Sequence, residues 1–448
     1  MKKLSLRFSI ASQFLSRVSP QSTLAEFDGL GYGLTLRSAV LPSIMKSATR
    51  YLVIAAATIV AVVVLVLWQR ADREAALEEL RIHFNAQVVE RDNEFFIGCD
   101  GEALVDLVEF ASLVKRVGEP TVIDLTGAPN LQSLDGFEGL TSVVSLVVID
   151  CPNLESVDGV SSHPNLAELI VMDATKLRDA SPIRRLPSLV TLDLTGSIAL
   201  EEFDLVGLSA LENLYLSRCR KLTSLDVSSL ALLKQLFLDG ASRIQSVTGL
   251  ERLDQLTDLD VSNASSLVGL KGVSGLSSLI VLDIRNVDVP DLSEIGQLAS
   301  LRVLRMGGQD SITSMEALSG LSSLKEIHLE ACPNLSSIKG IPSSVSQYAG
   351  FTHCPKLETL SGIEVCDGLE QLDVTGCRNL KDIKQVSQLR SLVQFSLVKC
   401  RQVTDIAPVA GLAELTIVML GGSGILPDSI EDIEMANSEI IFDFAVGE

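Results

Sequence analysis

The sequence predicts an α/β-type repeat solenoid with one transmembrane helix near its N-terminus. A short apolar motif recurs along most of the 448 residues, and aromatic residues make up only 4% of the chain. Stacked repeats fill their core with layers of aliphatic side chains, so this composition suits a solenoid. A separate apolar run without any charge lies close to the N-terminus and predicts the helix.

The recurring motif has the form L-x-x-L-x-L-x-x-C, as in residues 211–219. Its ninth position falls at Ala128, Cys151, Ala174, Ser197, Cys219, Ala241, Ala264, Val287, Gln309, Cys332, Cys354, Cys377, Cys400 and Ser423. Successive copies are 22 or 23 residues apart, and about fourteen of them keep this register, which chance does not produce. Alternate residues of a strand face opposite sides, so the leucines of L-x-L point inward. One unit cannot bury its own apolar face, and neighbouring units must stack.

The second half of each unit is also regular, as in Cys151-Pro-Asn-Leu-Glu-Ser-Val and Cys332-Pro-Asn-Leu-Ser-Ser-Ile. Over about residues 118–425 the chain resembles the leucine-rich repeat family, and VTDIAPVAGL at 403–412 is similar to the internalin-like class with short repeats. The resemblance implies a horseshoe with a parallel β-sheet on the concave side. Recurrent Pro and Gly predict a convex side of irregular segments and 3-10 turns. The family usually places Asn at the ninth position to bond neighbouring backbones, so Cys, Ala and Ser there predict a weaker ladder.

The apolar run at residues 51–68 is 18 residues long and begins and ends with aromatic residues, Tyr51 and Trp68. Its length suits a membrane-spanning helix, and its end residues suit the two interfaces. The alternatives are a buried core helix and a cleaved signal peptide. A signal peptide has a shorter apolar core and a small-residue cleavage site, which residues 69–73 do not offer. We therefore expect a retained signal anchor.

The segment before the anchor, residues 1–50, is a basic tail. This charge favours an N-terminus in the cytoplasm and repeats in the periplasm or outside the cell, as a single-pass membrane protein. Met45 itself stands at the start of a typical signal anchor. Residues 1–44 are either a disordered tail or an upstream extension that is not translated, and both interpretations stay open.

Two further segments flank the repeats. In residues 69–117, Leu77, Leu80, Phe84 and Val88 recur with helical spacing and predict a stalk helix rather than a dimerisation helix. A second helical pattern, Leu104, Leu107, Val108, Ala111 and Val114, is expected to cap the open core of the first repeat. The acidic segment 426–448 is expected to cap the other end. The oligomeric state is left open.

The chemistry-bearing residues give no sign of an active site. No H-E-x-x-H, G-x-S-x-G, phosphate loop or C-x-x-C motif occurs, so we expect no enzyme, no metal and no cofactor. Cys332, Cys354, Cys377 and Cys400 occupy four successive layers. Stacked strands lie about 4.8 Å apart, whereas a disulfide needs Cβ atoms about 3.8 Å apart. Free, buried thiols are therefore expected.

The charge of the chain is unevenly placed. The formal net charge is −21, while residues 1–70 carry eight basic and two acidic side chains. The remainder holds 28 basic and 55 acidic residues, or −27. Such an acidic body repels a phosphate backbone, which argues against nucleic acid as a partner.

The outward positions of the predicted strands form a candidate binding face. It contains two features, an apolar patch and an aromatic pair flanked by acids: Val147, Ile149, Ile170 and Met172, and then Tyr215 and Phe237 beside Asp239, Asp258, Asp260 and Asp283. Exposed aromatic residues near unpaired charge are typical of binding hot spots, and contiguous apolar patches typically mark contact sites. The alternative is that β-branched and aromatic residues simply favour strands.

These observations predict a membrane-anchored binding module that recognises a protein or cell-envelope ligand on its concave face. Two alternatives stay open: a structural or self-assembling spacer of the envelope, and a regulatory scaffold that faces the cytoplasm.

Overall fold

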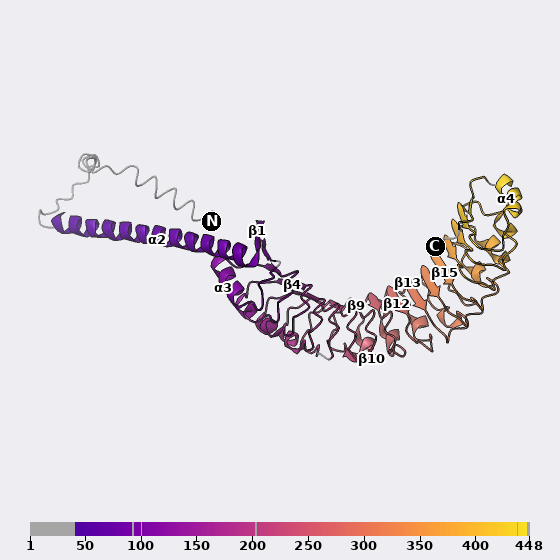
Figure 1. The fold of residues 1–448 in the computed structure, drawn as a ribbon, viewed down its shortest axis with the longest axis horizontal. Helices are drawn as coiled ribbons and strands as arrows, with labels where there is room; N and C mark the ends of the chain where they lie inside the picture. The colour runs from indigo at the N-terminus through magenta and orange to yellow at the C-terminus, as the bar shows by residue number, and fades with distance from the viewer. Residues whose placement is uncertain (1–40, 92–93, 100, 202–203, 437, 446–448) are drawn as a thin grey trace, which may run out of the picture. The chain divides into compact units, whose positions relative to one another are not determined.

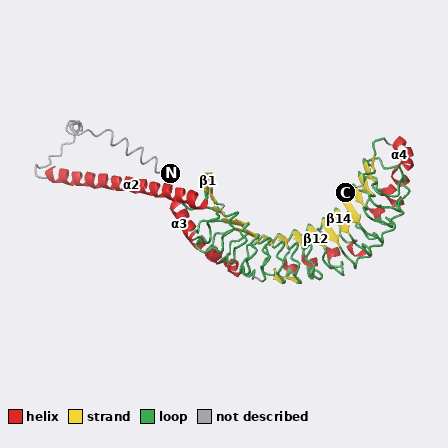
Figure 2. Ribbon diagram, viewed as in Figure 1, coloured by secondary structure: helices red, strands yellow, loops and turns green. Residues whose placement is uncertain are grey.

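The computed structural model describes residues 41–91, 94–99, 101–201, 204–436 and 438–445, with side chains from residue 58 onward except at residues 91, 94, 162 and 436. The chain divides into two compact units, Met1–Ala71 and Asp72–Glu448. The second unit is a curved solenoid. Its strands line the concave side and its loops and short helices form the convex side (Figures 1 and 2).

The long helix α2 spans Leu41–Phe84 and includes the whole apolar run predicted at 51–68. Within the described residues, no helix combines the length and hydropathy that a membrane crossing requires. The predicted transmembrane segment is therefore not confirmed. The expectation for residues 1–40 lies outside the described part, and α2 begins before the boundary expected at residue 51.

The N-terminal cap contains more β-structure than the sequence indicated. Strands β1 (Gln87–Arg91) and β2 (Glu94–Gly98) form an antiparallel hairpin, and β2 continues into the parallel sheet. The predicted stalk helix was expected to continue through Val88, and this was wrong. Helix α2 ends at Phe84, and Asn85 turns the chain with a φ of 49°. Phe84 then packs edge-on against Phe110 of helix α3 (Val108–Val117), with ring centroids 5.7 Å apart.

The helix α3 covers the core of the first repeat, as expected. Ala111 and Val114 are buried on it, and Leu104 and Leu107 are buried just before it. Val108 departs from the prediction, because 59% of it is exposed at the first turn of the helix. At the other end of the solenoid, the short helix α4 (Glu431–Ala436) precedes the last strand of the sheet.

Among the described residues, seventeen strands form one sheet, parallel except for the β1–β2 pair. After the hairpin its strands are, in spatial order, β3 (Val122–Asp124), β4 (Ser145–Ile149), β5 (Glu168–Met172), β6 (Thr191–Asp193), β7 (Asn213–Tyr215), β9 (Gln235–Phe237), β11 (Asp258–Asp260), β12 (Val281–Arg285), β13 (Val303–Gly307), β14 (Glu326–Glu330), β15 (Tyr348–Thr352), β16 (Gln371–Asp373), β17 (Gln394–Ser396), β18 (Ile417–Met419) and β19 (Ile441–Asp443). Each repeat pairs with the next one along the chain.

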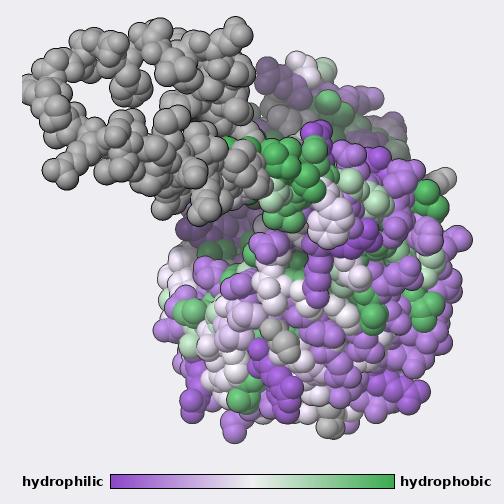
Figure 3. All heavy atoms as spheres, turned by 90° about the vertical axis from the view of Figure 1, so that its left-hand side faces the viewer, coloured by the Kyte–Doolittle hydropathy of each residue, from purple (hydrophilic) through white to green (hydrophobic). Residues whose placement is uncertain are grey.

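The opposite side carries short 3-10 helices and a second, two-stranded sheet of β8 (Ser224–Asp226) and β10 (Ser246–Thr248). The 3-10 helices are η1 (Phe137–Gly139), η2 (Asp158–Ser162), η3 (Ser181–Arg185), η4 (Leu250–Arg252), η5 (Val273–Gly275), η6 (Ile295–Gln297), η7 (Glu316–Leu318), η8 (Ile363–Val365), η9 (Lys384–Gln388), η10 (Ala407–Val409) and η11 (Pro427–Ser429). Leu, Ile and Val side chains fill the space between the two sides. The solvent-facing surface is mostly hydrophilic in the view of Figure 3.

A left-handed turn residue follows each concave strand, one position before the ninth residue of the motif. These residues are Gly127, Asp150, Asp173, Gly196, Arg218, Gly240, Asn263, Asn286, Gly308, Ala331, His353, Gly376, Lys399 and Gly422. The N–H groups of the first thirteen donate to carbonyls of the next repeat, as from Gly127 to Ile149 and from Ala331 to Thr352. The main chain itself therefore carries bonds between repeats, and the weaker side-chain ladder expected from Cys, Ala and Ser stays a prediction.

The ninth-position cysteines add to this ladder. The thiol of Cys151 lies 3.4 Å from the carbonyl oxygen of Leu125, and that of Cys400 lies 3.0 Å from that of Val374, each in the preceding repeat. The four ladder cysteines, Cys332, Cys354, Cys377 and Cys400, are free and buried, as expected. Burial raises the pKa of Cys400 to about 12, which keeps this thiol protonated and unreactive at neutral pH.

Candidate binding surface on the concave sheet

The outward residues of the parallel strands form continuous rows across the concave face. Strand pairing places ten predicted or neighbouring positions in one row: Val147, Ile170, Asp193, Tyr215, Phe237, Asp260, Asp283, Arg305, His328 and Gly350. Neighbouring members stand about 4.8 Å apart at the backbone. The sequence register therefore predicted the order of side chains along this row.

The predicted aromatic pair is assembled side by side. Tyr215 on β7 and Phe237 on β9 are register partners, and their rings stack with centroids 5.3 Å apart and planes 24° apart. Both side chains are partly exposed. The hydroxyl of Tyr215 donates to Oε1 of Gln235 at 2.6 Å, which fixes the orientation of its ring. Burial, together with Asp193 and Asp258, raises the pKa of Tyr215, so the hydroxyl stays neutral.

Three of the four acidic residues expected beside this pair, Asp239, Asp258 and Asp260, border it at the surface. Asp258 and Asp260 pair in register with Gln235 and Phe237, respectively. Asp239, two residues after Phe237, accepts a hydrogen bond from the hydroxyl of Ser217. Burial raises the pKa of Asp260, and the nearby carboxylates of Asp283 and Asp239 raise it further. The aromatic–acidic surface, defined as Tyr215, Phe237, Asp239, Asp258 and Asp260, is thus a region of concentrated negative charge.

The fourth acid, Asp283, does not belong to this surface as an unpaired charge. Only 3% of it is exposed, and Arg285 clamps its carboxylate with Nε at 3.0 Å and Nη2 at 2.7 Å. The backbone N–H of Arg285 adds a third bond at 3.1 Å. The prediction of a free acid was wrong because Arg285 lies two residues further on the same strand, on the same face, where its long side chain folds back.

The predicted apolar patch is formed by two adjacent strands. Val147 and Ile149 of β4 pair in register with Ile170 and Met172 of β5. All four side chains are partly exposed rather than fully exposed. Strand β6 separates this patch from Tyr215, and Asp193 occupies the intervening outward position.

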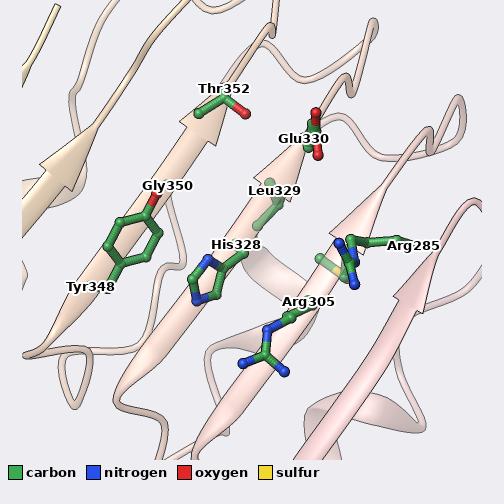
Figure 4. Close-up of a pocket in the computed structure, with 9 residues that line it drawn as sticks. Arg285, Arg305, His328, Leu329, Glu330, Tyr348, Gly350 and Thr352 are labelled. Atoms are coloured by element: carbon green, nitrogen blue, oxygen red, sulfur yellow. The ribbon is translucent and has the colours of Figure 1, made fainter. Parts of the chain in front are cut away.

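Sequence analysis did not identify a hollow further along the sheet. It has a volume of about 220 Å³ and is lined chiefly by Arg285, Arg305, His328, Glu330, Tyr348 and Thr352 (Figure 4). Its signal in the sequence was the pair of outward glycines, Gly307 and Gly350, which leave space on the face. We call this site the basic hollow.

Ring stacking forms one wall of the basic hollow. The rings of His328 and Tyr348 stack with centroids 4.3 Å apart and planes 21° apart. A Cβ atom at Gly350 would lie 2.6 Å from Cε1 of Tyr348, so glycine is required for this ring position. Burial lowers the pKa of His328, and the charge of Arg305 lowers it further, while Glu326 acts in the opposite direction.

No sequence profile of a known protein family matches this chain, and no curated protein matches it. Similar solved structures include an internalin (InlF) from Listeria monocytogenes strain 4b F2365, with 17% identity over 72% of this chain and 79% of that one and a TM-score of 0.48. A leucine-rich repeat protein of Leptospira interrogans is 19% identical over 74% of this chain and 80% of that one, with a TM-score of 0.49. TLR13, solved in complex with ssRNA13, is 18% identical over 76% of this chain and 56% of that one, with a TM-score of 0.52.

The long parallel sheet, the stacked repeats and this structural likeness define the fold as that of a leucine-rich repeat solenoid.

Proposed function

We propose that this protein is a membrane-anchored binding module whose concave face recognises a basic protein or cell-envelope ligand. The observation that carries the proposal is the stacked, partly exposed pair Tyr215–Phe237 beside three acidic side chains. Large aromatic side chains supply contact area at a small entropic cost, because each has only two χ angles. Carboxylates around them favour a partner with Lys or Arg groups.

The fold supports a binding role. A leucine-rich repeat sheet presents a long row of outward side chains, and repeat solenoids use such extended concave surfaces for binding. The solved structure of TLR13 contains a bound RNA. For this chain we propose a protein or envelope ligand instead, because its acidic surface repels phosphate backbones.

The proposed anchor is the apolar part of α2 that the sequence predicts at 51–68. Its described side chains from Ile59 to Trp68 include nine large exposed hydrophobics: Ile59, Val60, Val62, Val63, Val64, Leu65, Val66, Leu67 and Trp68. The exposed fraction is 60% at Val60 and 65% at Trp68. Exposed apolar surface on all sides of a helix is costly in water and favourable in lipid. With the basic N-terminal tail, this supports repeats outside the cytoplasm.

The binding proposal is tested by replacing Tyr215 and Phe237 with Ala together. We expect partner affinity to fall by more than about 2 kcal/mol, the loss typical of a hot spot. The measurement is capture of partners from envelope extract of the source cell by wild-type and variant protein, followed by affinity measurement on the captured partner. A raised salt concentration should also weaken capture by the wild type.

A matched control removes two exposed apolar side chains that lie off the concave strands, Val206 and Leu232. The variant Val206→Ala/Leu232→Ala should capture the same partners at the wild-type yield. Equal capture by all three proteins would overturn the assignment of the aromatic–acidic surface.

The anchor proposal has its own test. Deletion of residues 51–68 should convert a protein that sediments with membranes into a soluble, folded one. Sedimentation of the shortened chain with membranes after a high-salt wash would contradict the anchor, and circular dichroism would check that the solenoid is intact.

A further inference from the structure

We propose that the basic hollow is a second binding site, separate from the aromatic–acidic surface, and that it takes an oxyanion such as a carboxylate or phosphate group. The two sites lie in the same outward row but have opposite chemistry. The inference stands on the hollow, on its two arginines and on its stacked wall, and it does not depend on the proposed function.

The first step of the argument is the shape of the site. A concave sheet normally has a side chain at every outward position, but Gly307 and Gly350 provide none at two positions in neighbouring rows. Tyr348 lies over Gly350 and His328 stacks on it, so the rings form a wall instead of closing the space. The volume of about 220 Å³ suits a small polar group rather than a large apolar ligand.

The second step is the charge of its lining. Arg285 and Arg305 extend from adjacent strands toward the hollow (Figure 4). Arg285 is partly committed to Asp283, whereas Arg305 forms no salt bridge with any residue that the structure describes. A guanidinium presents several N–H donors in a plane, which matches the oxygens of a carboxylate or phosphate. A free arginine in a hollow of an acidic protein therefore favours an anionic group.

The third step concerns the remaining polar groups. Glu330 is the acidic residue in the lining. Glu326 and Asp373 do not line the hollow but hydrogen-bond to its two rings, Glu326 to His328 at 3.3 Å and Asp373 to Tyr348 at 3.5 Å. The hydroxyl of Thr352 is a neutral hydrogen-bond donor at the rim. Glu330 opposes an anion in the hollow, so its removal should strengthen binding.

The site can be tested by NMR on the full chain labelled with ¹³C at histidine rings. The chain has four histidines, so the signal of His328 can be assigned with a His328→Gln variant. Inorganic phosphate and N-acetylaspartate are the two probes, each titrated at constant ionic strength against sodium chloride. We expect a saturable shift of the His328 signal and none for His83 or His353.

Three charge variants make the result specific. Arg305→Gln should weaken binding about tenfold, the equivalent of one charge-assisted hydrogen bond. Glu330→Gln should strengthen it about threefold. Arg302→Gln is the matched control, because Arg302 is an exposed arginine next to the same strand and does not line the hollow.

The probes also separate the two sources of an oxyanion. Saturation by phosphate alone identifies a phosphoryl ligand, saturation by N-acetylaspartate alone identifies a carboxylate, and saturation by both identifies a general oxyanion site. A shift that is linear in concentration and is reproduced by chloride, or one that Arg305→Gln and Arg302→Gln alter equally, would overturn the proposal.

Discussion

The two halves of the concave row share one backbone but differ in what their outward side chains do. Between β4 and β11 the row holds apolar, aromatic and acidic side chains. Between β13 and β15 the row holds Arg305, His328 and Gly350, a second glycine, Gly307, lies in the neighbouring row, and a hollow opens. Parallel pairing is the same in both halves, so the side chains alone create the difference.

The boundary between the halves is the Asp283–Arg285 pair on β12. Asp283 ends the acidic stretch, but its charge is neutralised by the arginine that opens the basic stretch. A basic ligand can therefore bind the aromatic–acidic surface while an acidic ligand binds the basic hollow, because the Asp283 carboxylate between the two sites is already paired with Arg285. This arrangement suits a long ligand with groups of both signs, or two ligands that bind independently.

The largest effect on stability should come from breaking this boundary. Arg285→Met removes three hydrogen bonds from a carboxylate that is 97% hidden from solvent, and we expect a loss of about 2 kcal/mol in the free energy of unfolding. Urea denaturation measures it. The double variant Asp283→Asn/Arg285→Met should recover part of the loss, and a single variant as stable as wild type would show that the pair is not needed.

The acidic half should show a smaller cost. Tyr215→Ala/Phe237→Ala removes a stacked pair that is only partly buried, so we expect about 1 kcal/mol, the usual worth of an aromatic pair. Thermal melting of the two single variants and the double variant would measure the coupling between the rings. A loss well above about 3 kcal/mol would mean that the rings act as core residues, which would remove the basis for a hot spot.

The sequence predicted the solenoid, the strand register and the neighbours of Tyr215, because these follow from a motif repeated many times. It did not predict the Asp283–Arg285 clamp or the His328–Tyr348 stack, since both depend on how long side chains fold back over the face. The β1–β2 hairpin was missed because Val88 continues a helical spacing that Asn85 interrupts. The sequence also did not predict the main-chain bonds between repeats, because they depend on a left-handed residue one position before the ninth.

The basic half can be probed by adding a side chain at Gly350. Gly350→Ala places a Cβ atom against the ring of Tyr348, and a flexible side chain can yield at a cost below about 1 kcal/mol. We expect the ring to move and the stack on His328 to open, which would shift the His328 ring signal in NMR. Gly411→Ala is the control, because nothing lies within 4 Å of a Cβ atom there. An unchanged His328 signal in Gly350→Ala would show that the glycine does not set the wall.

The smallest expected effect is a dependence of stability on pH that arises in both regions of the chain. Burial lowers the pKa of His328 in the basic half and of His163, whose Nε2 lies 2.6 Å from the carbonyl oxygen of Phe137. The unfolded chain then binds more protons than the folded one as pH falls through about 6.5, so the free energy of unfolding decreases in that window.

The slope of the free energy of unfolding against pH, between about pH 7.5 and pH 6, should shrink in His163→Gln. It should shrink by a smaller amount in His328→Gln, because His328 is less buried and has Glu326 as a partner. His353→Asn, at an exposed turn, should keep the wild-type slope. Urea titrations at several pH values measure these slopes, and equal slopes in all four proteins would show that neither buried histidine is linked to folding.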